Sequence, residues 1–380
     1  MRARLFIFSF SHFSLAITRP SISFLSSFGS AANVSCSNSK PFIFNYLIEN
    51  FGFSETVATA TLNRLPNVKQ PNKPDSVLHF LRQSGFSETH IRDAVRISPQ
   101  ILFANIEKTL EPKFKVFQEL GLTGSDLGLF LSKNAKLLTA SLDQKLIPGI
   151  KILKNILSND DHVIRVLQRC KWILYKDPSS RLLPNISFLQ SCGIVGSQLS
   201  MLLKYQPILF AMKEPKLQNL IIRVKEMGFS VDSRMFVYAL YTVSCMMPDT
   251  LQRKFELFRS FGFSEEEFMS AFRKAPSLLR TSEKKLQLGI EFFVNTVGLD
   301  RSALVNNPTC LMHSLEKRVS PRHRVIEILR SKMLLKNPSI IYAMQISEAD
   351  FLEKYILKFG EDAGELLAAY QGGGLDISKS

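Results

Sequence analysis

A repeat of about 36 residues runs through this chain of 380 residues and limits the folds that it can adopt. Four-residue segments whose third and fourth positions are apolar begin at Pro99, Ala135, Lys171 and Pro207, each 36 residues after the one before. Less regular copies begin at Val243, Pro276, Pro308 and Pro338. Repeats of this length are typical of solenoids, in which each unit buries its apolar face only against neighbouring units.

Two further anchors keep the same interval. A leucine that lies two residues before a proline recurs at Leu110, Leu146 and Leu182. Later relatives of the proline in this anchor lie around Asn219, Arg253, Leu288 and Pro321. A glycine that follows an apolar stretch is the third anchor, and it occurs at Gly85, Gly121, Gly193, Gly228, Gly262 and Gly298. Three anchors in one register exclude a chance repeat.

Each unit is predicted to hold two helices joined by a tight turn. In the clearest copy Ser264 precedes three glutamates, a pattern that caps and charges the start of a helix. Pro276 disfavours the helical conformation of the residue before it, so the first helix should end there. A second helix should begin at Ser282 and end at Gly298, because glycine adopts a positive φ at little cost. Since no segment shows the sustained alternation of a strand, we expect an all-α solenoid.

The first 48 residues differ in composition from the rest of the chain. They contain no Asp or Glu, four basic residues and many serines, and the first acidic residue is Glu49. This composition is typical of an organelle transit peptide. We therefore expect residues 1–38 to be removed on import, into the mitochondrion in preference to the plastid because of the early arginines and clustered phenylalanines. A secretory signal is the alternative, since residues 5–17 are mostly apolar, although three serines and a histidine interrupt them.

The remainder of the chain is also basic. The whole sequence has 48 Lys and Arg against 33 Asp and Glu, a net charge of +15, and 44 against 33 remain after the first 48 residues. Such an excess favours a polyanionic partner. Five scattered cysteines without a C-x-x-C pair argue against a disulfide framework or a zinc finger. No run of 18 apolar residues predicts a membrane span.

The sequence offers no catalytic constellation. Its six histidines form no H-E-x-x-H motif, and His162 lies near Asp160, Asp161 and Cys170 on one helix surface without a visible oxyanion donor. The glycines of residues 372–374 follow no strand, so they are not a phosphate-binding loop. We expect no enzyme activity, no metal and no cofactor.

The repeat resembles that of the mitochondrial transcription termination factor (mTERF) family, and specifically its land-plant branch. The tetratricopeptide pattern does not fit, because this chain has a single tryptophan, and pentatricopeptide repeats lack a Pro-x-Leu-Leu turn. The segments that carry the resemblance are residues 73–78, 263–267, 292–295, 314–318 and 351–354. The resemblance covers about residues 42–370 and departs from the pattern at Ala135, Lys171 and Val243, where the turn proline is absent.

Membership of this family implies a superhelix of about eight to nine repeats, each with two α-helices and a 3₁₀ turn. It also implies import into an organelle and binding to organellar DNA or RNA. On this basis residues 39–345 are expected to form the repeat array, residues 346–371 C-terminal capping helices and residues 372–380 a disordered tail.

One helix-end position carries a cation in six of eight units. This first ladder lies two or three residues before the turn and consists of Arg96, Lys133, Arg169, Lys204, Arg273 with Lys274, and Lys336. The helix macrodipole favours cations at a C-terminus by about 0.3–1 kcal/mol, so the ladder is explained equally well without a ligand.

A second ladder lies three residues before the proline position of the second anchor, in the first turn of the second helix. Its members are Lys145, Arg181, Lys216, Lys285 and Arg318, with Lys108 one residue out of register. The macrodipole disfavours cations at a helix N-terminus, and a stripe of like charge repels itself. We therefore expect an external counter-charge, which a phosphate backbone supplies.

Aromatic residues lie near several turns, at Trp172, Tyr175, Tyr205, Phe210 and Tyr241. They are suited to stacking on exposed bases. Their helical spacing favours the alternative, in which they belong to the core.

Together these features predict an organellar nucleic-acid-binding protein that regulates gene expression from a basic face of the solenoid. The outcome is transcription termination or regulation, or RNA processing such as intron splicing. We expect a monomer whose partners are organellar DNA or RNA and other gene-expression proteins. A helical-repeat scaffold for protein interactions is the alternative, because solenoids offer extended surfaces to peptides as well.

Overall fold

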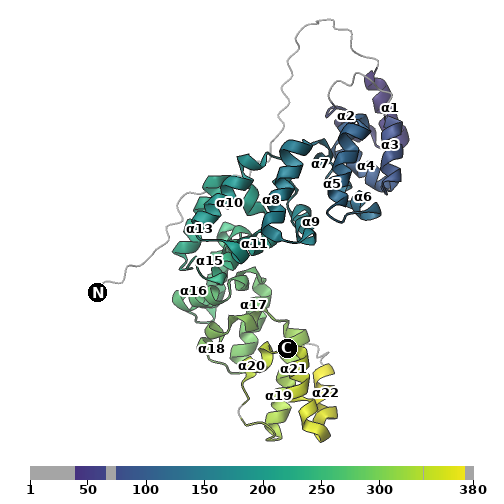
Figure 1. Ribbon diagram of the computed structural model, residues 1–380. Coiled ribbons are helices and arrows are strands. Elements are labelled where there is room, and N and C mark those ends of the chain that lie inside the picture. The colour runs from purple at the N-terminus through teal and green to yellow at the C-terminus, as the bar shows by residue number, and fades with distance from the viewer. Residues whose placement is uncertain (1–38, 66–73, 337, 373–380) are drawn as a thin grey trace.

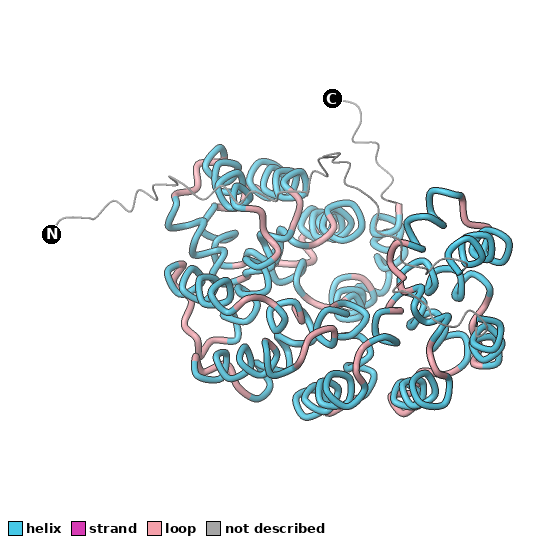
Figure 2. The backbone as a smooth tube through the Cα atoms, turned by 90° about the horizontal axis from the view of Figure 1, so that it is seen from above, coloured by secondary structure: helices cyan, strands magenta, loops and turns pink. Residues whose placement is uncertain are grey.

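The computed structural model describes residues 39–65, 74–336 and 338–372, and these residues form helices and no strands. The helices follow one another along an elongated, curved stack from α1 to α22 (Figure 1). Seen from above, short loops join the helices throughout the stack (Figure 2). The predicted all-α solenoid is confirmed. The expected transit peptide, residues 1–38, lies outside the described residues, as do residues 373–380 of the expected tail.

Each complete unit contains a first helix, a turn and a second helix. The first helices are α4 (Glu88–Ile97), α6 (Gly124–Lys133), α9 (Asp160–Arg169), α11 (Gly196–Tyr205), α14 (Arg234–Ser244), α16 (Glu265–Lys274) and α18 (Arg301–Asn306). The second helices are α5 (Glu111–Gln118), α8 (Ile147–Leu157), α10 (Leu182–Ser191), α13 (Glu214–Glu226), α15 (Pro248–Ser260), α17 (Glu283–Glu291), α19 (Ser320–Ser331) and α21 (Glu348–Tyr355). The stack begins with α1 (Ser39–Phe51), α2 (Glu55–Leu62) and α3 (Pro74–Gln83), and it ends with η10 (Leu357–Asp362) and α22 (Ala363–Gln371).

The turn between the two helices is a short helix of its own in most units. The turns are η1 (Pro99–Phe103), α7 (Lys136–Thr139), η4 (Lys171–Leu174), α12 (Ile208–Ala211), η6 (Pro276–Arg280), η8 (Pro308–Met312) and α20 (Ile340–Gln345). Turns pack against the second helix of the preceding unit, as η1 does against α3 and η8 against α17. The fourth residue of the anchor segment is therefore buried, and Leu102, Leu174 and Phe210 are each 0% exposed.

The fifth and eighth units depart from the pattern. Near Val243, where the turn proline is absent, α14 continues to Ser244 and α15 begins at Pro248, so no separate turn forms. The other two units without the proline keep a turn, as α7 and η4. In the eighth unit Lys336 lies in the loop after α19, so the helix end expected at this residue does not form.

The predicted helix boundaries of the sixth unit are confirmed. The Ser264 hydroxyl accepts a hydrogen bond from the Glu267 amide at 3.1 Å, and the Ser264 amide donates to the Glu267 carboxylate at 2.8 Å. Ser282 caps α17, and the helical turn η7 (Phe292–Thr296) carries the chain to Gly298. The reciprocal bonds at Ser264 satisfy two amides that the start of a helix leaves without partners.

The glycine anchor closes each second helix in the left-handed region. All six anchor glycines have positive φ, from +72° at Gly298 to +95° at Gly121. The second unit has no glycine at this position, and Ser158 adopts φ +53° instead. At Gly85 a side chain is also excluded by space, since an added Cβ would lie 2.5 Å from the backbone of Gly124.

The proline of the second anchor changes the helix that precedes it. The π-helical turns η2 (Ile106–Leu110), η3 (Leu142–Leu146) and η9 (Leu315–Val319) precede Pro112, Pro148 and Pro321. In the first of these the Leu110 amide donates to the Asn105 carbonyl, five residues back. A proline has no N–H and its ring displaces the carbonyl four residues before it, so the wider turn accommodates both effects. It also directs the anchor residues Leu110, Leu146 and Val319 into the core, where each is at most 1% exposed.

Within the described residues no helix is both long enough and apolar enough to cross a bilayer.

Candidate nucleic-acid interface

Apart from Lys336, which lies in the loop after α19, the first ladder lies at the C-terminal ends of the first helices, on one edge of the stack. Arg96, Lys133, Arg169 and Lys274 are exposed. Lys204 and Arg273 are half-buried, and the Arg273 stem packs over Gly228, whose added Cβ would lie 3.2 Å from Arg273 Cδ. The exposed members are therefore accessible to a ligand, whereas Arg273 also contributes to packing.

Hydrogen bonds between neighbouring units hold these helix ends side by side. Arg169 Nη1 donates to the Lys204 carbonyl of the next unit at 2.6 Å. Arg64 Nη1 donates to the Arg96 carbonyl at 2.9 Å, and Lys274 Nζ donates to Asn306 Oδ1 at 2.5 Å. The last carbonyls of a helix lack intrahelical partners, so the bonds of Arg64 and Arg169 to carbonyls are favourable without a ligand. Part of the first ladder thus has an internal role.

A groove of about 850 Å³ opens where three members of the first ladder meet. Arg96, Lys133 and Arg169 line it, together with Trp172. Asp93 and Asp126 also line it, and Arg96 Nη2 lies 3.1 Å from Asp93 Oδ1 in an exposed ion pair. Lys133 has no hydrogen-bond or ion-pair partner for its ammonium among the described residues. The cations therefore outnumber the carboxylates in the groove, and Lys133 is available to an anion.

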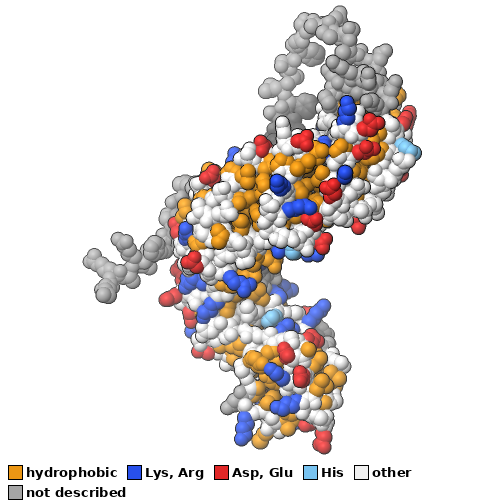
Figure 3. Space-filling model, viewed as in Figure 1, with side chains coloured by type: hydrophobic (Ala, Val, Ile, Leu, Met, Phe, Trp, Pro, Cys, Tyr) orange, Lys and Arg blue, Asp and Glu red, His pale blue; other side chains and the backbone are white. Residues whose placement is uncertain are grey.

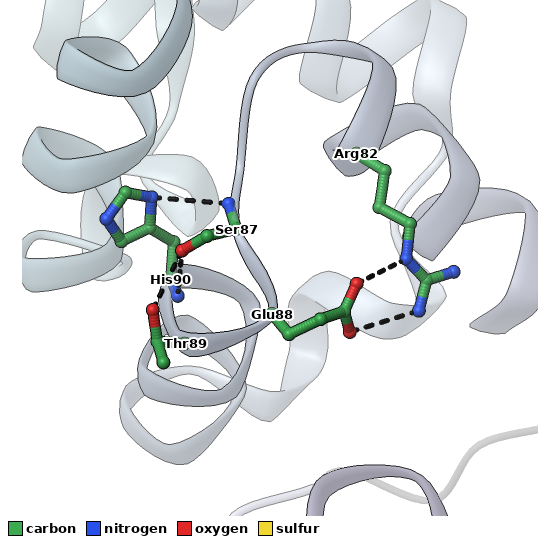
Figure 4. Close-up of polar contacts among 5 residues, drawn as sticks. All are labelled: Arg82, Ser87, Glu88, Thr89 and His90. Carbon is green, nitrogen blue, oxygen red and sulfur yellow. Dashed lines mark hydrogen bonds and ion pairs between the residues drawn. The ribbon is translucent and has the colours of Figure 1, made fainter.

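Helix α4, which carries Arg96, is fixed at its other end by a capping box (Figure 4). The Ser87 hydroxyl accepts from the His90 amide at 3.2 Å, and the Ser87 amide donates to His90 Nδ1 at 3.4 Å. Arg82 of α3 donates to both carboxylate oxygens of Glu88, at 2.7 and 3.2 Å. These bonds orient α4 against the preceding helix, and with it the cation at the end of α4.

Three members of the second ladder do not project freely into solvent. Arg181 Nη1 donates to the Ala211 carbonyl at 3.2 Å, and Lys285 Nζ donates to the Met312 carbonyl at 2.6 Å. Arg318 donates to three carbonyls at the end of α20, at 2.6 to 3.1 Å. Each acceptor lies at the end of the turn in the next unit. The counter-charge that the sequence assigns to phosphate is supplied here by carbonyl dipoles of the protein itself.

The other three members differ from these. Lys108 and Lys216 are exposed, and their side chains have no hydrogen-bond partner among the described residues. Lys145 is half-buried near Asp177; hydrogen bonds from Ser179 hold the pKa of the Asp177 carboxyl below its usual value, and the charge of Lys145 adds to this effect. Only these three members of the second ladder remain suited to binding an external anion.

A further set of buried side chains, which the sequence did not identify, donates to carbonyls of the next unit in the same way as Arg181, Lys285 and Arg318. Their position lies three residues after the second-anchor residue and is occupied by Lys113, Asn185, Lys254 and Arg322. Lys113 Nζ donates to the Leu138 carbonyl at 2.6 Å, and Lys254 Nζ donates to the Leu279 carbonyl at 2.6 Å. Burial lowers the pKa of both ammonium groups. We call these four residues, with Arg181, Lys285 and Arg318, the inter-unit staples.

The residue types found at this buried position are a sequence signal for the staples. Where the position holds glycine instead, the next turn packs directly against the helix: an added Cβ at Gly149 would collide with Leu174 Cδ2, and one at Gly289 would lie 3.3 Å from Leu311 Cδ2. The first seven units place either glycine or a hydrogen-bond donor at this position, except for Leu220 in the fourth, and this pattern indicates contact with another segment of the chain.

The aromatic residues at the turns divide into two groups. Phe210 is fully buried, as the core interpretation predicts, and Tyr175 and Tyr241 are half-buried. Trp172 and Tyr205 are exposed, at 57% and 46%. On the face shown in Figure 3, Lys and Arg side chains lie in small groups among apolar ones, and several gather near the middle of the stack. Within the described residues no group of three or more His, Cys, Asp or Glu side chains could hold a metal ion.

Comparison with known proteins places these features in a family. Residues 78–233, 143–259 and 239–352 match the model of the family described as mTERF. Among curated proteins, the chain is similar to "Transcription termination factor MTERF8, chloroplastic" of Arabidopsis thaliana. The two are 23% identical over 275 residues, which cover 71% of this chain and 53% of that protein. The chain thus aligns with about half the length of this relative.

Proposed function

The chain belongs to the mTERF family, and from this premise we propose that it is an organellar nucleic-acid-binding protein that regulates gene expression. It acts by occupying a DNA or RNA site, with transcription termination, transcription regulation and intron splicing as the candidate outcomes. The name of the Arabidopsis relative supports a role in transcription termination. No catalytic step is part of this proposal.

The observation that carries the proposal is the groove lined by Arg96, Lys133 and Arg169. Stacking of successive units brings these cations, which are 36 or 37 residues apart in the sequence, to one edge of the stack. Like charges held at one edge by the fold repel one another, and a phosphate backbone that lies along them relieves this repulsion. Phosphate contacts of this kind position the protein and carry no sequence information.

A salt titration of binding tests this proposal. Arg96, Lys133, Arg169 and Lys274 are replaced together by glutamine, and a control variant carries glutamine at the exposed lysines Lys115, Lys151, Lys225 and Lys358. Both variants lose four positive charges and therefore have the same net charge. Each phosphate contact contributes about 0.9 to the slope of log affinity against log salt on duplex DNA, and about 0.7 on a single strand.

The edge variant should therefore lose up to about 3–4 units of slope, while the control stays close to the unmodified protein. Equal slopes in the two variants would place the nucleic-acid path elsewhere on the molecule. If the unmodified protein binds neither DNA nor RNA in a salt-dependent manner, the protein-interaction scaffold becomes the better proposal.

The proposed location is the mitochondrion, with the chloroplast as the alternative. The acid-free N-terminal composition supports an organelle, and the relative named above is a chloroplast protein. A fusion of residues 1–60 to a fluorescent protein distinguishes the two organelles. A cytosolic or secreted fusion would contradict both.

A further inference from the structure

We propose that the edge of the stack that carries the first ladder binds single-stranded nucleic acid. Bases would stack on the exposed rings of Trp172 and Tyr205, which form an aromatic row with the half-buried Tyr241. This inference rests on the proposed function and deepens it by naming the class of ligand. An intact duplex has its bases stacked on one another and offers none of them to a protein ring, whereas a single strand offers every base.

The row arises from the register of the repeat. The position two residues before the turn segment is occupied in successive units by Lys133, Arg169, Tyr205, Tyr241 and Lys274. Two rings therefore lie between two units on one side and one unit on the other that present a cation at the same place. Cations and aromatic rings along one edge are suited to a single strand, because cations contact the phosphates and rings contact the bases.

Contacts between the units make this edge continuous. Arg169 donates to the carbonyl of Lys204, the residue before Tyr205, at 2.6 Å. The rings of Tyr205 and Tyr241 are stacked, with centroids 6.0 Å apart and planes inclined by 29°. The Arg280 guanidinium lies 4.1 Å from the centroid of the Tyr241 ring. The third to sixth units thus present one connected series of ring and cation surfaces.

Trp172 extends the row into the groove lined by Arg96, Lys133 and Arg169. It is 57% exposed, although the core of this chain buries large aromatic side chains such as Phe117 and Phe272 completely. Its ring meets Tyr175 edge-on, at a centroid distance of 5.5 Å and an angle of 68°. An exposed indole beside three cations combines the two kinds of group that a single strand requires.

Trp172 also provides the test, because it is the one tryptophan of the sequence. The full chain is titrated with a labelled oligouridine, an oligothymidine and a DNA duplex of the same length, while anisotropy reports binding and tryptophan emission reports the groove. The single strands should quench Trp172 emission with the same midpoint as the anisotropy change. The duplex should bind more weakly and leave the emission unchanged. The two single strands distinguish RNA from DNA as the preferred source.

Variants of Tyr205 distinguish the loss of base stacking from a loss of folding. Tyr205→Ala should weaken binding of the preferred single strand by about 10-fold, and Tyr205→Phe should bind like the unmodified protein because the ring is retained. Tyr342→Ala, which removes a 45% exposed ring from α20, is the control and should leave affinity unchanged. Thermal unfolding of each variant verifies that the fold is kept.

Saturable anisotropy with unchanged Trp172 emission and an unaffected Tyr205→Ala variant would overturn the inference and leave the proposed function standing. Tighter binding of the duplex than of either single strand would also overturn it. Absence of binding to all three probes would instead contradict the proposed function itself.

Discussion

Ser158 is a serine at a backbone position with positive φ, which glycine adopts at lower cost. It closes α8 with φ +53°, where six other units place glycine. A side chain in the left-handed region destabilises the folded state by about 1–2 kcal/mol, and glycine removes this strain. Glycine also raises the conformational entropy of the unfolded chain, which lowers stability by about 0.4–1 kcal/mol. Ser158→Gly should therefore stabilise the protein by about 0.5–1 kcal/mol in a denaturant titration. Asn155→Gly, in the exposed interior of the same helix, should destabilise it by a similar amount. Stabilisation by both changes would contradict this explanation.

His313 should make stability depend on pH. Burial, together with the nearby positive charges of Arg318, Arg322 and Lys285, lowers its pKa to about 4. The unfolded chain takes up this proton near pH 6.5 and the folded chain only near pH 4, so stability falls as pH falls through this window. The loss should be about 1–3 kcal/mol between pH 7 and pH 4.

His313→Gln removes this titration, and the stability of the variant should change less over the same pH range. Denaturant midpoints at several pH values measure the difference. An identical pH profile for the variant and the unmodified protein would show that the pKa of His313 is the same in the folded and the unfolded chain.

At the scale of elements, the inter-unit staples join a second helix to the turn that follows in the next unit. Lys254 is 4% exposed, and its ammonium donates to the Leu279 and Thr281 carbonyls at the end of η6. Lys254→Met keeps the apolar stem and leaves these carbonyls without a donor, at a cost of about 1–3 kcal/mol. Hydrogen exchange should show the loss of protection in η6 and α17. Lys225→Met, at an exposed lysine, is the matched control. A loss of stability of similar size in this control would show that the bonds of Lys254 to the carbonyls do not contribute to stability.

The staples also change how the basic ladders are interpreted. A cation in the first turn of a second helix is unfavourable for that helix alone, and this argument favours an external anion for the whole second ladder. In the stack, the turn of the next unit presents carbonyl oxygens to the same side chains. Arg181, Lys285 and Arg318 are satisfied in this way, so the phosphate contacts expected of them are better sought at the exposed first-ladder edge.

At the scale of the whole molecule, stability should be distributed along the stack. Leu137 and Leu278 lie in turns of different units, and each is 0% exposed. Leu137→Ala or Leu278→Ala should cost about 2–5 kcal/mol, and protection from hydrogen exchange should fall most in the adjacent units. Uniform loss of protection along the chain would indicate a single cooperative core in place of a solenoid.

The sequence by itself determined the period, the helix boundaries and the closing glycines, because these depend on local preferences. Caps such as Ser264, turn prolines such as Pro276 and left-handed glycines such as Gly298 act within a few residues of their own position. The departure expected at Val243 is observed, since α14 and α15 have no separate turn between them, whereas Ala135 and Lys171 also lack the proline and their units keep a turn. The absence of the proline therefore does not decide by itself whether a turn forms.

The tertiary structure alone decided which cations face solvent. Lys216 and Lys285 cannot be distinguished by their spacing in the repeat, yet Lys216 is exposed and Lys285 bonds to the Met312 carbonyl, 27 residues further along the chain. The acceptor is provided by the stacking of one unit on the next, and no local sequence window contains both groups. For the same reason the exposed rings of Trp172 and Tyr205 could not be separated from the buried ring of Phe210 before the units were packed together.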